Sequence, residues 1–269
     1  MSDAAVTDRP IVEEYNGLAP PRFDSVEAER AHRKDRLVAA LRIVGGRGLA
    51  TGVAGHITVR DPEHADRFWV NPLGTPFTLM TVDDLLLVDD EGTVVVGDKP
   101  LNGAAFAIHS AIHRRFPNLN AAAHAHSPNG RPWSATGRLL EPTSQDACAF
   151  YETQVVHDSF SGVVLDEDEG AAIAESLAQP TPFAHGNKAA SLVNHGHLTV
   201  GETVDEAAFW YLLFEKIAGD QLALEATGRP YKVLPHDVAS FTRDQTGSHF
   251  AGWLGFHGPY AEIKAAGGF

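Results

Sequence analysis

Apolar residues recur along the chain at two spacings, and each spacing predicts a different kind of element. Spacings of three and four residues, as in Leu37, Leu41 and Val44, predict an α-helix because such positions share one face. Short apolar runs between turn residues predict strands. The predicted helices cover residues 25–45, 102–116, 167–177 and 203–228, with a helix or turn at 128–136. The predicted strands cover residues 51–60, 68–70, 84–88, 93–96, 119–127 and 189–193, with a short extended piece at 163–165.

This mixture of elements predicts a single α/β domain between an N-terminal arm and a C-terminal tail. Residues 1–24 lack periodicity and are interpreted as a flexible arm. Residues 25–230 hold the predicted domain. Residues 231–269 are rich in glycine and aromatic residues and are interpreted as a tail that packs on the domain or on a neighbouring subunit. The elements do not alternate with the regularity of a Rossmann domain, and no Walker sequence occurs.

Composition and charge narrow the classes of function. The 269 residues carry a net charge of −14, without the basic stripe that is typical of nucleic-acid-binding proteins. No apolar run approaches the roughly 20 residues of a membrane-spanning helix, and no signal segment opens the chain. The single cysteine, Cys148, excludes an intrachain disulfide and is interpreted as a buried apolar residue. We therefore expect a cytoplasmic protein with neither nucleic-acid nor membrane partners.

Three of the fourteen histidines occupy positions from which they can act together. His124 and His126 lie one residue apart in an alanine-rich predicted strand, so their side chains project from the same face. His195 ends another predicted strand and precedes Gly196, which allows close backbone approach. Three such imidazoles can bind a divalent metal and leave coordination positions open for catalysis. The alternative is that they are hydrogen-bonded histidines of the core.

The chain resembles the class II aldolase/adducin-head family in the order of several motifs between about residues 31 and 228. They are G-L-A-T-G-V-A-G-H-I-T-V-R at 48–60, N-P-L-G at 71–74, the helix with His109, A-A-H-A-H-S at 122–127 and N-H-G-H-L-T-V-G at 194–201. The resemblance implies a class II aldolase-like α/β fold, with a mostly antiparallel central sheet flanked by helices. It also implies a homotetramer with active sites near subunit interfaces, and His124, His126 and His195 as metal ligands.

Departures from the family pattern change the expected substrate. The sugar-phosphate aldolases of the family have a glutamate acid/base four residues before the helix histidine, where this chain has Ala105. Loss of such a base costs retro-aldol cleavage a factor of about 10²–10⁴. The positions of the family's phosphate pocket are also altered. They are Gly55-His56, Leu73-Gly74 and Gly103-Ala104. An apolar substrate whose carboxylate is held by the metal and His56 therefore fits better than a sugar phosphate.

A closer resemblance is to the non-haem iron oxygenases of aminocoumarin-antibiotic biosynthesis, through A-A-F-A-I-H-S-A-I-H-R-R-F-P at 104–117 and T-S-Q-D-A-C-A-F-Y-E at 143–152. Those enzymes convert a prenylated 4-hydroxyphenylpyruvate to a benzoate by successive oxidative decarboxylations. The resemblance implies an Fe(II) dioxygenase that takes a small carboxylate substrate and O₂, although three histidines also suit Zn(II), Mn(II) or Co(II). One alternative is a Zn- or Mn-dependent aldolase or decarboxylase with an unphosphorylated substrate. Another is a non-catalytic, adducin-like assembly module.

Several further residues have candidate roles in this site, each with a structural alternative. His109 is expected either to support catalysis behind the metal ligands or to pack in the core. Tyr151 is a candidate proton donor or an interface residue, and Glu152 is a candidate replacement for the missing carboxylate. Gln145 and Asp146 are expected to orient a ligand histidine, to contact substrate or to lie in a solvated turn.

Two other histidines accompany the predicted site. His113 lies four residues after His109, on the same helical face, and is expected to be exposed. His197 lies two residues after His195 and on the same side if the strand continues. It is then an extra ligand or base, unless the chain turns there.

Overall fold

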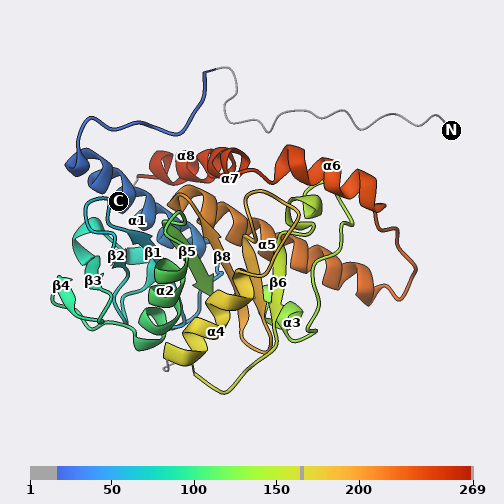
Figure 1. The fold of residues 1–269 in the computed structure, drawn as a ribbon, viewed down its shortest axis with the longest axis horizontal. Helices are drawn as coiled ribbons and strands as arrows, with labels where there is room; N and C mark the ends of the chain where they lie inside the picture. The colour runs from blue at the N-terminus through green and yellow to red at the C-terminus, as the bar shows by residue number, and fades with distance from the viewer. Residues whose placement is uncertain (1–16, 164–166, 268–269) are drawn as a thin grey trace.

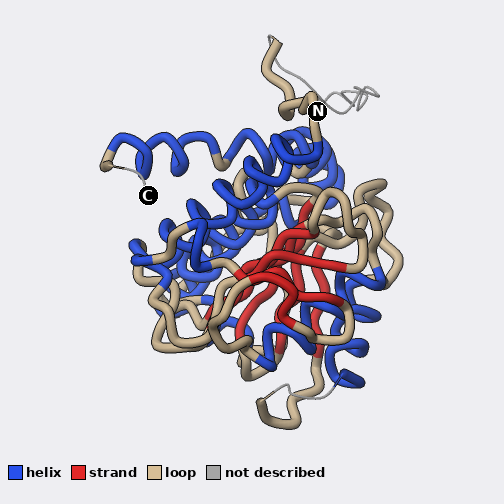
Figure 2. The backbone as a smooth tube through the Cα atoms, turned by 90° about the vertical axis from the view of Figure 1, so that its left-hand side faces the viewer, coloured by secondary structure: helices blue, strands red, loops and turns tan. Residues whose placement is uncertain are grey.

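The computed structural model describes residues 17–163 and 167–267, and one eight-stranded sheet lies at its centre (Figure 2). The strands are β1 (Gly55–Arg60), β2 (Arg67–Val70), β3 (Leu86–Asp89), β4 (Val94–Val96), β5 (Ala121–Ala125), β6 (Gln154–His157), β7 (Ala189–Leu192) and β8 (Gly196–Gly201). Their order is β4-β3-β2-β1-β5-β8-β7-β6, and every neighbouring pair is antiparallel except β6 and β7. The predicted α/β fold with a mostly antiparallel sheet is confirmed.

Helices cover both faces of the sheet (Figures 1 and 2). On one face, α1 (Val26–Gly46) and α5 (Val204–Ala226) pack against apolar side chains such as Ile57 and Ala123. On the other face lie α2 (Gly103–Arg115) and α4 (Glu167–Leu177). Because side chains alternate along a strand, β1 turns Ile57 toward α1 and turns His56 and Thr58 toward α2.

The long helices begin near their predicted positions because polar side chains cap them. The side chains of Ser25, Asn102 and Thr203 each accept a hydrogen bond of 3.1 Å from a backbone N–H in the first turn of α1, α2 and α5. A cap satisfies a donor that has no partner within the helix and contributes about 1 kcal/mol. These caps fix where α2, which carries His109 and His113, starts relative to the sheet.

The segment after α5 is helical and packs on the domain of its own chain. It forms α6 (His236–Thr246), α7 (His249–Gly255) and α8 (His257–Ala265), which lie in a row across α1 and α5 (Figure 1). Phe256 is fully buried in the same core as Leu37 of α1. The hydroxyl of Tyr260 donates to the Asp35 carboxylate over 2.6 Å. Among the described helices, none combines the length and apolar character that crossing a membrane requires.

The hydrophobic pattern does not predict β6 or β8, because both strands mix polar with apolar residues. The helix-or-turn segment forms α3 (Gly130–Ser134), and the mixed segment after it contains a 3₁₀ turn at Ala147–Phe150. Two further 3₁₀ turns lie at Phe77–Leu79 and Val82–Asp84, and the second delays the start of β3. Of the predicted arm, residues 1–16 lie outside the described residues, as do positions 164 and 165 of the short extended piece.

Candidate metal centre

The three predicted metal ligands meet where β5 ends beside the turn between β7 and β8. His124 lies in β5, His126 directly follows it, and His195 lies in the turn. Their candidate ligand nitrogens are all within 4.8 Å of one another. The ring centroids are 4.7–5.3 Å apart and the rings meet at steep angles. One metal ion fits this set, because three imidazole nitrogens converge on a single point.

The turn that carries His195 depends on two unusual backbone conformations. Asn194 has a φ of 62°, and Gly196 has a φ of 155°. Residues with a side chain rarely adopt the φ of Gly196. Asparagine tolerates the left-handed conformation and glycine permits a φ of 155°, so the N-H-G sequence brings His195 onto the end of β5.

A backbone carbonyl determines which nitrogen of His124 is free. Its Nδ1–H donates to the carbonyl of His197 over 2.9 Å, which leaves the Nε2 lone pair for a metal. Burial lowers the pKa of all three imidazoles, and it lowers that of His195 to about 4. The rings are therefore neutral near pH 7, which is the form that binds metals.

A cavity of about 540 Å³ opens beside the three histidines. Its lining includes His56, an apolar wall and one guanidinium, that of Arg131. The apolar wall consists of Val53, Ala54, Leu73, Ala104, Phe160 and Val163. Arg131 is exposed, its Nε donates to the Ser127 carbonyl over 3.4 Å, and no carboxylate within the described ranges pairs with it. The cavity thus offers a place for a metal, an apolar group and an anion.

A buried carboxylate on α5 holds the backbone that precedes Arg131. Glu215 accepts a hydrogen bond from the hydroxyl of Ser127 and from the backbone N–H groups of Asn129 at 2.8 Å and Gly130 at 2.7 Å. These contacts fix the loop that runs from His126 into α3. Charge-assisted bonds to backbone donors are among the stronger hydrogen bonds in proteins, so the backbone that leads into Arg131 is well defined.

Behind the cavity, His109 joins a chain of hydrogen bonds between β1 and α2. Its Nε2 lies 2.7 Å from Nδ1 of His56, and its Nδ1 lies 2.7 Å from Oγ1 of Thr58. The same hydroxyl lies 2.9 Å from Nε2 of His113. The expectation that His113 is exposed is wrong, because it is only 5 % exposed and stacks on Phe68.

The structure brings some of the predicted pocket residues to the cavity and not others. His56 and Leu73 line it, whereas Gly74 and Gly103 are exposed and do not. Ala105 faces away from it, into the apolar core formed with β2 and β3. Burial lowers the pKa of His56 well below its usual value, so this ring offers a hydrogen bond rather than a positive charge. The cationic side chain among the lining residues is that of Arg131, which the sequence pattern did not indicate.

Three predicted residues lie away from the cavity in this chain. The hydroxyl of Tyr151 is 3.0 Å from Nδ1 of His236 in α6. The carboxylate of Glu152 is paired with Arg243 at 2.6 Å. Gln145, like Asp146 beside it, is exposed near the 3₁₀ turn at Ala147–Phe150. None of the three lines the cavity of its own chain.

His197 contributes its backbone rather than its ring. Because β8 continues past the turn, its imidazole points to the α5 face, stacked on Tyr211 at 4.3 Å and Phe214 at 4.5 Å. The chain turns between β7 and β8, which is the alternative that the sequence left open, and His197 is therefore not placed as an extra ligand. Cys148 is buried, as expected, and burial raises the pKa of its thiol.

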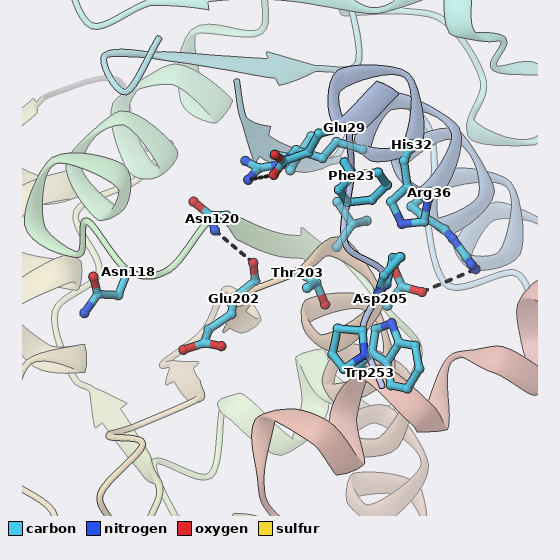
Figure 3. A pocket seen from close by; sticks show the side chains of 15 residues that line it. Phe23, Glu29, His32, Arg36, Asn118, Asn120, Glu202, Thr203, Asp205 and Trp253 are labelled. Atoms are coloured by element: carbon cyan, nitrogen blue, oxygen red, sulfur yellow. Dashed lines mark hydrogen bonds and ion pairs between the residues drawn. The ribbon is translucent and has the colours of Figure 1, made fainter. Parts of the chain in front are cut away.

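A different cavity, of about 290 Å³, lies between the N-terminal segment, α1, α5 and α7 (Figure 3). Its principal charges pair with each other: Arg36 lies 3.3 Å from Asp205, and Arg33 pairs with Glu29. A second group with metal-ligand atoms, Asp61 with Glu63 and His64, has both carboxylates bonded to Arg30. Only the histidine set therefore combines neutral ligands with an open cavity among the described residues.

Residues 35–222 match the family described as Class II Aldolase and Adducin N-terminal domain, and the chain belongs to this family. Within it, the chain is 45% identical to "Decarboxylase NovR" of Streptomyces niveus, over 87% of this chain and 84% of that protein. It is 44% identical to a "4-hydroxy-3-prenylphenylpyruvate oxygenase/4-hydroxy-3-prenylbenzoate synthase" of Streptomyces roseochromogenus subsp. oscitans, over 87% of this chain and 82% of the relative. The resemblance inferred from the motifs is confirmed.

A solved structure also resembles the whole chain. It is titled an L-fuculose 1-phosphate aldolase from Glaciozyma antarctica PI12, and it superimposes with a TM-score of 0.84 and 42% sequence identity. The match covers 93% of this chain and 95% of that one. Some relatives of this chain are thus named as an oxygenase or a decarboxylase, and one similar structure is titled an aldolase. The residues that line the cavity are the evidence for choosing between these chemistries.

Proposed function

We propose that this protein is an Fe(II)-dependent oxygenase that oxidatively decarboxylates an aromatic 2-oxo or 2-hydroxy acid. The observation that carries the proposal is the composition of the cavity. It combines three neutral imidazoles, an apolar wall and the unpaired guanidinium of Arg131, with no Asp or Glu among its lining residues. The names of the two Streptomyces relatives support the same chemistry.

In this proposal, His124, His126 and His195 hold the iron through three positions and leave the others open. Bound Fe(II) supplies a site where a 2-oxo acid and O₂ can be activated together. The reaction balances without an external reductant. An arylpyruvic acid and O₂ contain together the same atoms as the 2-hydroxy acid one carbon shorter and CO₂. The protein's part is to bind, orient and shield the reacting groups.

Arg131 is assigned to the substrate carboxylate. A guanidinium recognises a carboxylate through two parallel N–H bonds, and this one is held in place by the loop that Glu215 fixes. The aromatic ring of the substrate then lies on the apolar wall beside Leu73 and Phe160. The Nε2 atom of His56 is left to exchange a hydrogen bond with the substrate.

The proposal is tested by anaerobic loading of the metal-free protein with Fe(II), followed by oxygen-electrode and product analysis with 4-hydroxyphenylpyruvate and with phenylpyruvate. We expect O₂ uptake that depends on both iron and the keto acid and is matched by CO₂ release. His124→Ala is the inactive control. Absence of O₂ uptake with every aryl 2-oxo acid, in protein that binds one iron per chain, contradicts the oxygenase assignment.

A second candidate function is a Zn- or Mn-dependent aldolase or decarboxylase with an unphosphorylated substrate. The observation that favours it is the 42% identity to the structure titled an aldolase. The absence of a carboxylate from the cavity lining argues against it, because retro-aldol cleavage needs a base. The same protein loaded with Zn(II) distinguishes the two, since aldol cleavage under nitrogen requires no oxygen.

We also propose that the protein assembles as a homotetramer with the cavity near a subunit interface. In support, Phe160 is 52 % exposed and Val163 is 76 % exposed at the cavity in a single chain. Exposed apolar side chains of this size commonly mark a surface that another subunit covers. Sedimentation velocity measures the assembly, and a monomer at micromolar concentration would contradict this proposal.

A further inference from the structure

A continuous chain of hydrogen bonds connects the metal cavity with a second cavity at the other end of β1. His56 lines the metal cavity, whereas His113 lines a separate cavity of about 300 Å³. Between them lie His109 and Thr58, and the three contacts measure 2.7, 2.7 and 2.9 Å. The chain runs between β1 and α2, an interface visible in Figure 1.

Each contact in this chain can reverse its direction. A neutral imidazole has one N–H donor and one acceptor nitrogen, and a hydroxyl can donate and accept at once. If His56 donates to His109, then His109 donates to Thr58, and Thr58 donates to His113. If His113 donates to Thr58, every contact points the opposite way. Both arrangements use all the contacts and leave every ring neutral.

The two arrangements differ only at the two ends of this chain of hydrogen bonds, His56 and His113. In the first, Nε2 of His56 is a bare acceptor in the metal cavity and Nδ1 of His113 carries a proton. In the second, Nε2 of His56 carries the proton and Nδ1 of His113 is bare. Conversion of one arrangement into the other therefore moves one proton equivalent from one cavity to the other.

At the far end of the hydrogen-bonded chain, His113 faces the second cavity, into which a proton can be released. Nδ1 of His113 and Oγ of Ser110 are buried without a hydrogen-bond partner among the described residues. Burial and the nearby Arg60 guanidinium lower the pKa of His113 to about 3, so its ring is neutral. Both residues line the second cavity, and its charged lining residues are Asp66, Asp90, Arg60 and Arg114. A polar cavity of this size has room for water, and water satisfies such buried groups.

We propose that His56, His109, Thr58 and His113 form a proton relay between the metal cavity and solvent. A proton accepted at Nε2 of His56 releases the one on its Nδ1 to Nε2 of His109. The Nδ1 proton of His109 passes to Thr58, the hydroxyl proton passes to Nε2 of His113, and Nδ1 of His113 gives its proton to the second cavity. Four bonds to hydrogen form and four break inside the chain, and no ring retains a charge. The use of the relay in turnover rests on the proposed function. Because the overall reaction releases no proton, a proton exported during a turnover returns by the reverse sequence of transfers, which restores the first arrangement.

The four side chains of the hydrogen-bonded chain are buried, and stability alone does not explain why these positions are polar. Next to them, the same strand–helix layer packs through apolar residues such as Val70 and Ile108. Apolar side chains of similar volume would stabilise the layer without the free energy of desolvating four polar groups.

The first test uses metal-free protein and measures the tautomers of His109 and His113 by imidazole nitrogen NMR. Replacement at the near end, His56→Phe, is expected to change the tautomer populations of His113 at the far end. In the Thr58→Val background, the same replacement is expected to leave His113 unchanged, because the hydroxyl link is missing. Thr58→Ser is expected to restore the response. Thr153→Val, at a buried threonine outside the chain, is the matched control.

The second test measures turnover of the iron-loaded enzyme with 4-hydroxyphenylpyruvate. Thr58→Val and His113→Phe are expected to lower kcat by about 10²-fold, the low end of the contribution of a positioned acid or base. The KM for the keto acid stays unchanged, and the solvent deuterium isotope effect on kcat rises.

The results separate the relay from the proposed function. If His56→Phe leaves the tautomer populations of His113 unchanged, the relay is overturned, whether or not the enzyme turns over. Coupled tautomers together with an unchanged kcat and isotope effect in Thr58→Val, in protein that does turn over, overturn its role in catalysis. If no O₂ uptake occurs with wild-type protein, the proposed oxygenase function is contradicted. The NMR result alone then tests whether the relay exists.

Discussion

A backbone carbonyl from β8 orients His124, and this single contact makes the centre sensitive to small changes. The ring can present Nε2 to a metal only while Nδ1–H is engaged by the carbonyl of His197. The other two ligands follow the end of β5 or lie in the β7–β8 turn, where the sheet still positions them. At the scale of single residues, metal affinity should therefore depend on each of the three ligand imidazoles. Substrate affinity should depend on Arg131.

Removal of one imidazole should abolish metal binding without unfolding the protein. We expect His124→Ala to weaken Fe(II) or Zn(II) binding by more than about 100-fold, because loss of an outer partner alone costs 10–100-fold. Isothermal titration with Zn(II) and metal analysis after dialysis measure the change. His64→Ala, in the other group of possible ligands, is the control and should bind normally. Equal losses in both variants would place the ion elsewhere.

Replacement of Arg131 should weaken the binding of the substrate carboxylate. Loss of a hydrogen bond to a charged group costs about 1.5–3 kcal/mol, which is roughly 10–150-fold in affinity. We expect Arg131→Gln to lower kcat/KM for an aryl 2-oxo acid by that factor and Arg131→Lys to recover part of it. Arg138→Gln, which removes a guanidinium paired with Glu225, is the control. If Arg131→Gln behaves like the control, another group holds the carboxylate.

At this scale, the sequence indicated the three histidines and two lining residues of the cavity, His56 and Leu73, but not Arg131. His124 and His126 were predicted because alternation along a strand places them on one face. Arg131 has no such signal, since it lies in a short helix whose position depends on Glu215, far along the chain. Thr58 shares a strand face with His56, and this spacing was the available clue to their common partner, His109.

At the scale of elements, α2 joins the sheet to the outer layer and carries two histidines of the hydrogen-bonded chain. It is held from outside by α4, which approaches so closely that a Cβ on Gly170 would lie 2.1 Å from the carbonyl oxygen of Ala107. The predicted strands are mainly short apolar runs beside turn residues, and the predicted long helices have apolar residues at helical spacing. β6 and β8 were missed because their pairing comes from neighbours in the sheet rather than from their own sequence.

A methyl group at Gly170 should therefore separate α4 from α2. We expect Gly170→Ala to lower the free energy of unfolding by about 1–3 kcal/mol through overpacking. Gly258→Ala is the matched control, because Gly258 lies in α8 with open space around its Cα. That substitution should raise stability by about 0.5–1 kcal/mol, since alanine favours a helix. Urea unfolding measures both, and a neutral Gly170→Ala would contradict the close contact.

At the scale of the whole molecule, the helices after α5 and the buried face of α5 enclose a lysine. Lys188 is only 4 % exposed. Its Nζ donates to the carbonyl of Gly247 and lies 4.4 Å from the centre of the Trp210 ring. Burial lowers the pKa of Lys188 to about 7. The C-terminal segment and the domain thus share an ionisable group that links stability to pH.

Stability should rise with pH between about 7 and 10.5 because of this lysine. The unfolded chain binds a proton at Lys188 up to about pH 10.5, whereas the folded protein releases it near pH 7. The free energy of unfolding therefore increases with pH by up to about 1.4 kcal/mol per unit from this group. Urea unfolding of Lys188→Met should show a shallower slope than wild type. Lys232→Met, at an exposed lysine, should keep the wild-type slope, and equal slopes in all three would contradict the burial.

The distance along the chain between the metal ligands determines when the centre can assemble. His124 and His126 are synthesised well before His195, and the carbonyl that orients His124 follows later still, in β8. Until β8 pairs with β5, the cell therefore holds a chain with an incomplete ligand set. Metal uptake should be a late event in biogenesis, and bound metal should raise the stability of correctly paired molecules alone. The fraction of molecules that hold a metal ion would then measure the fraction in which β8 has paired with β5 in the native register.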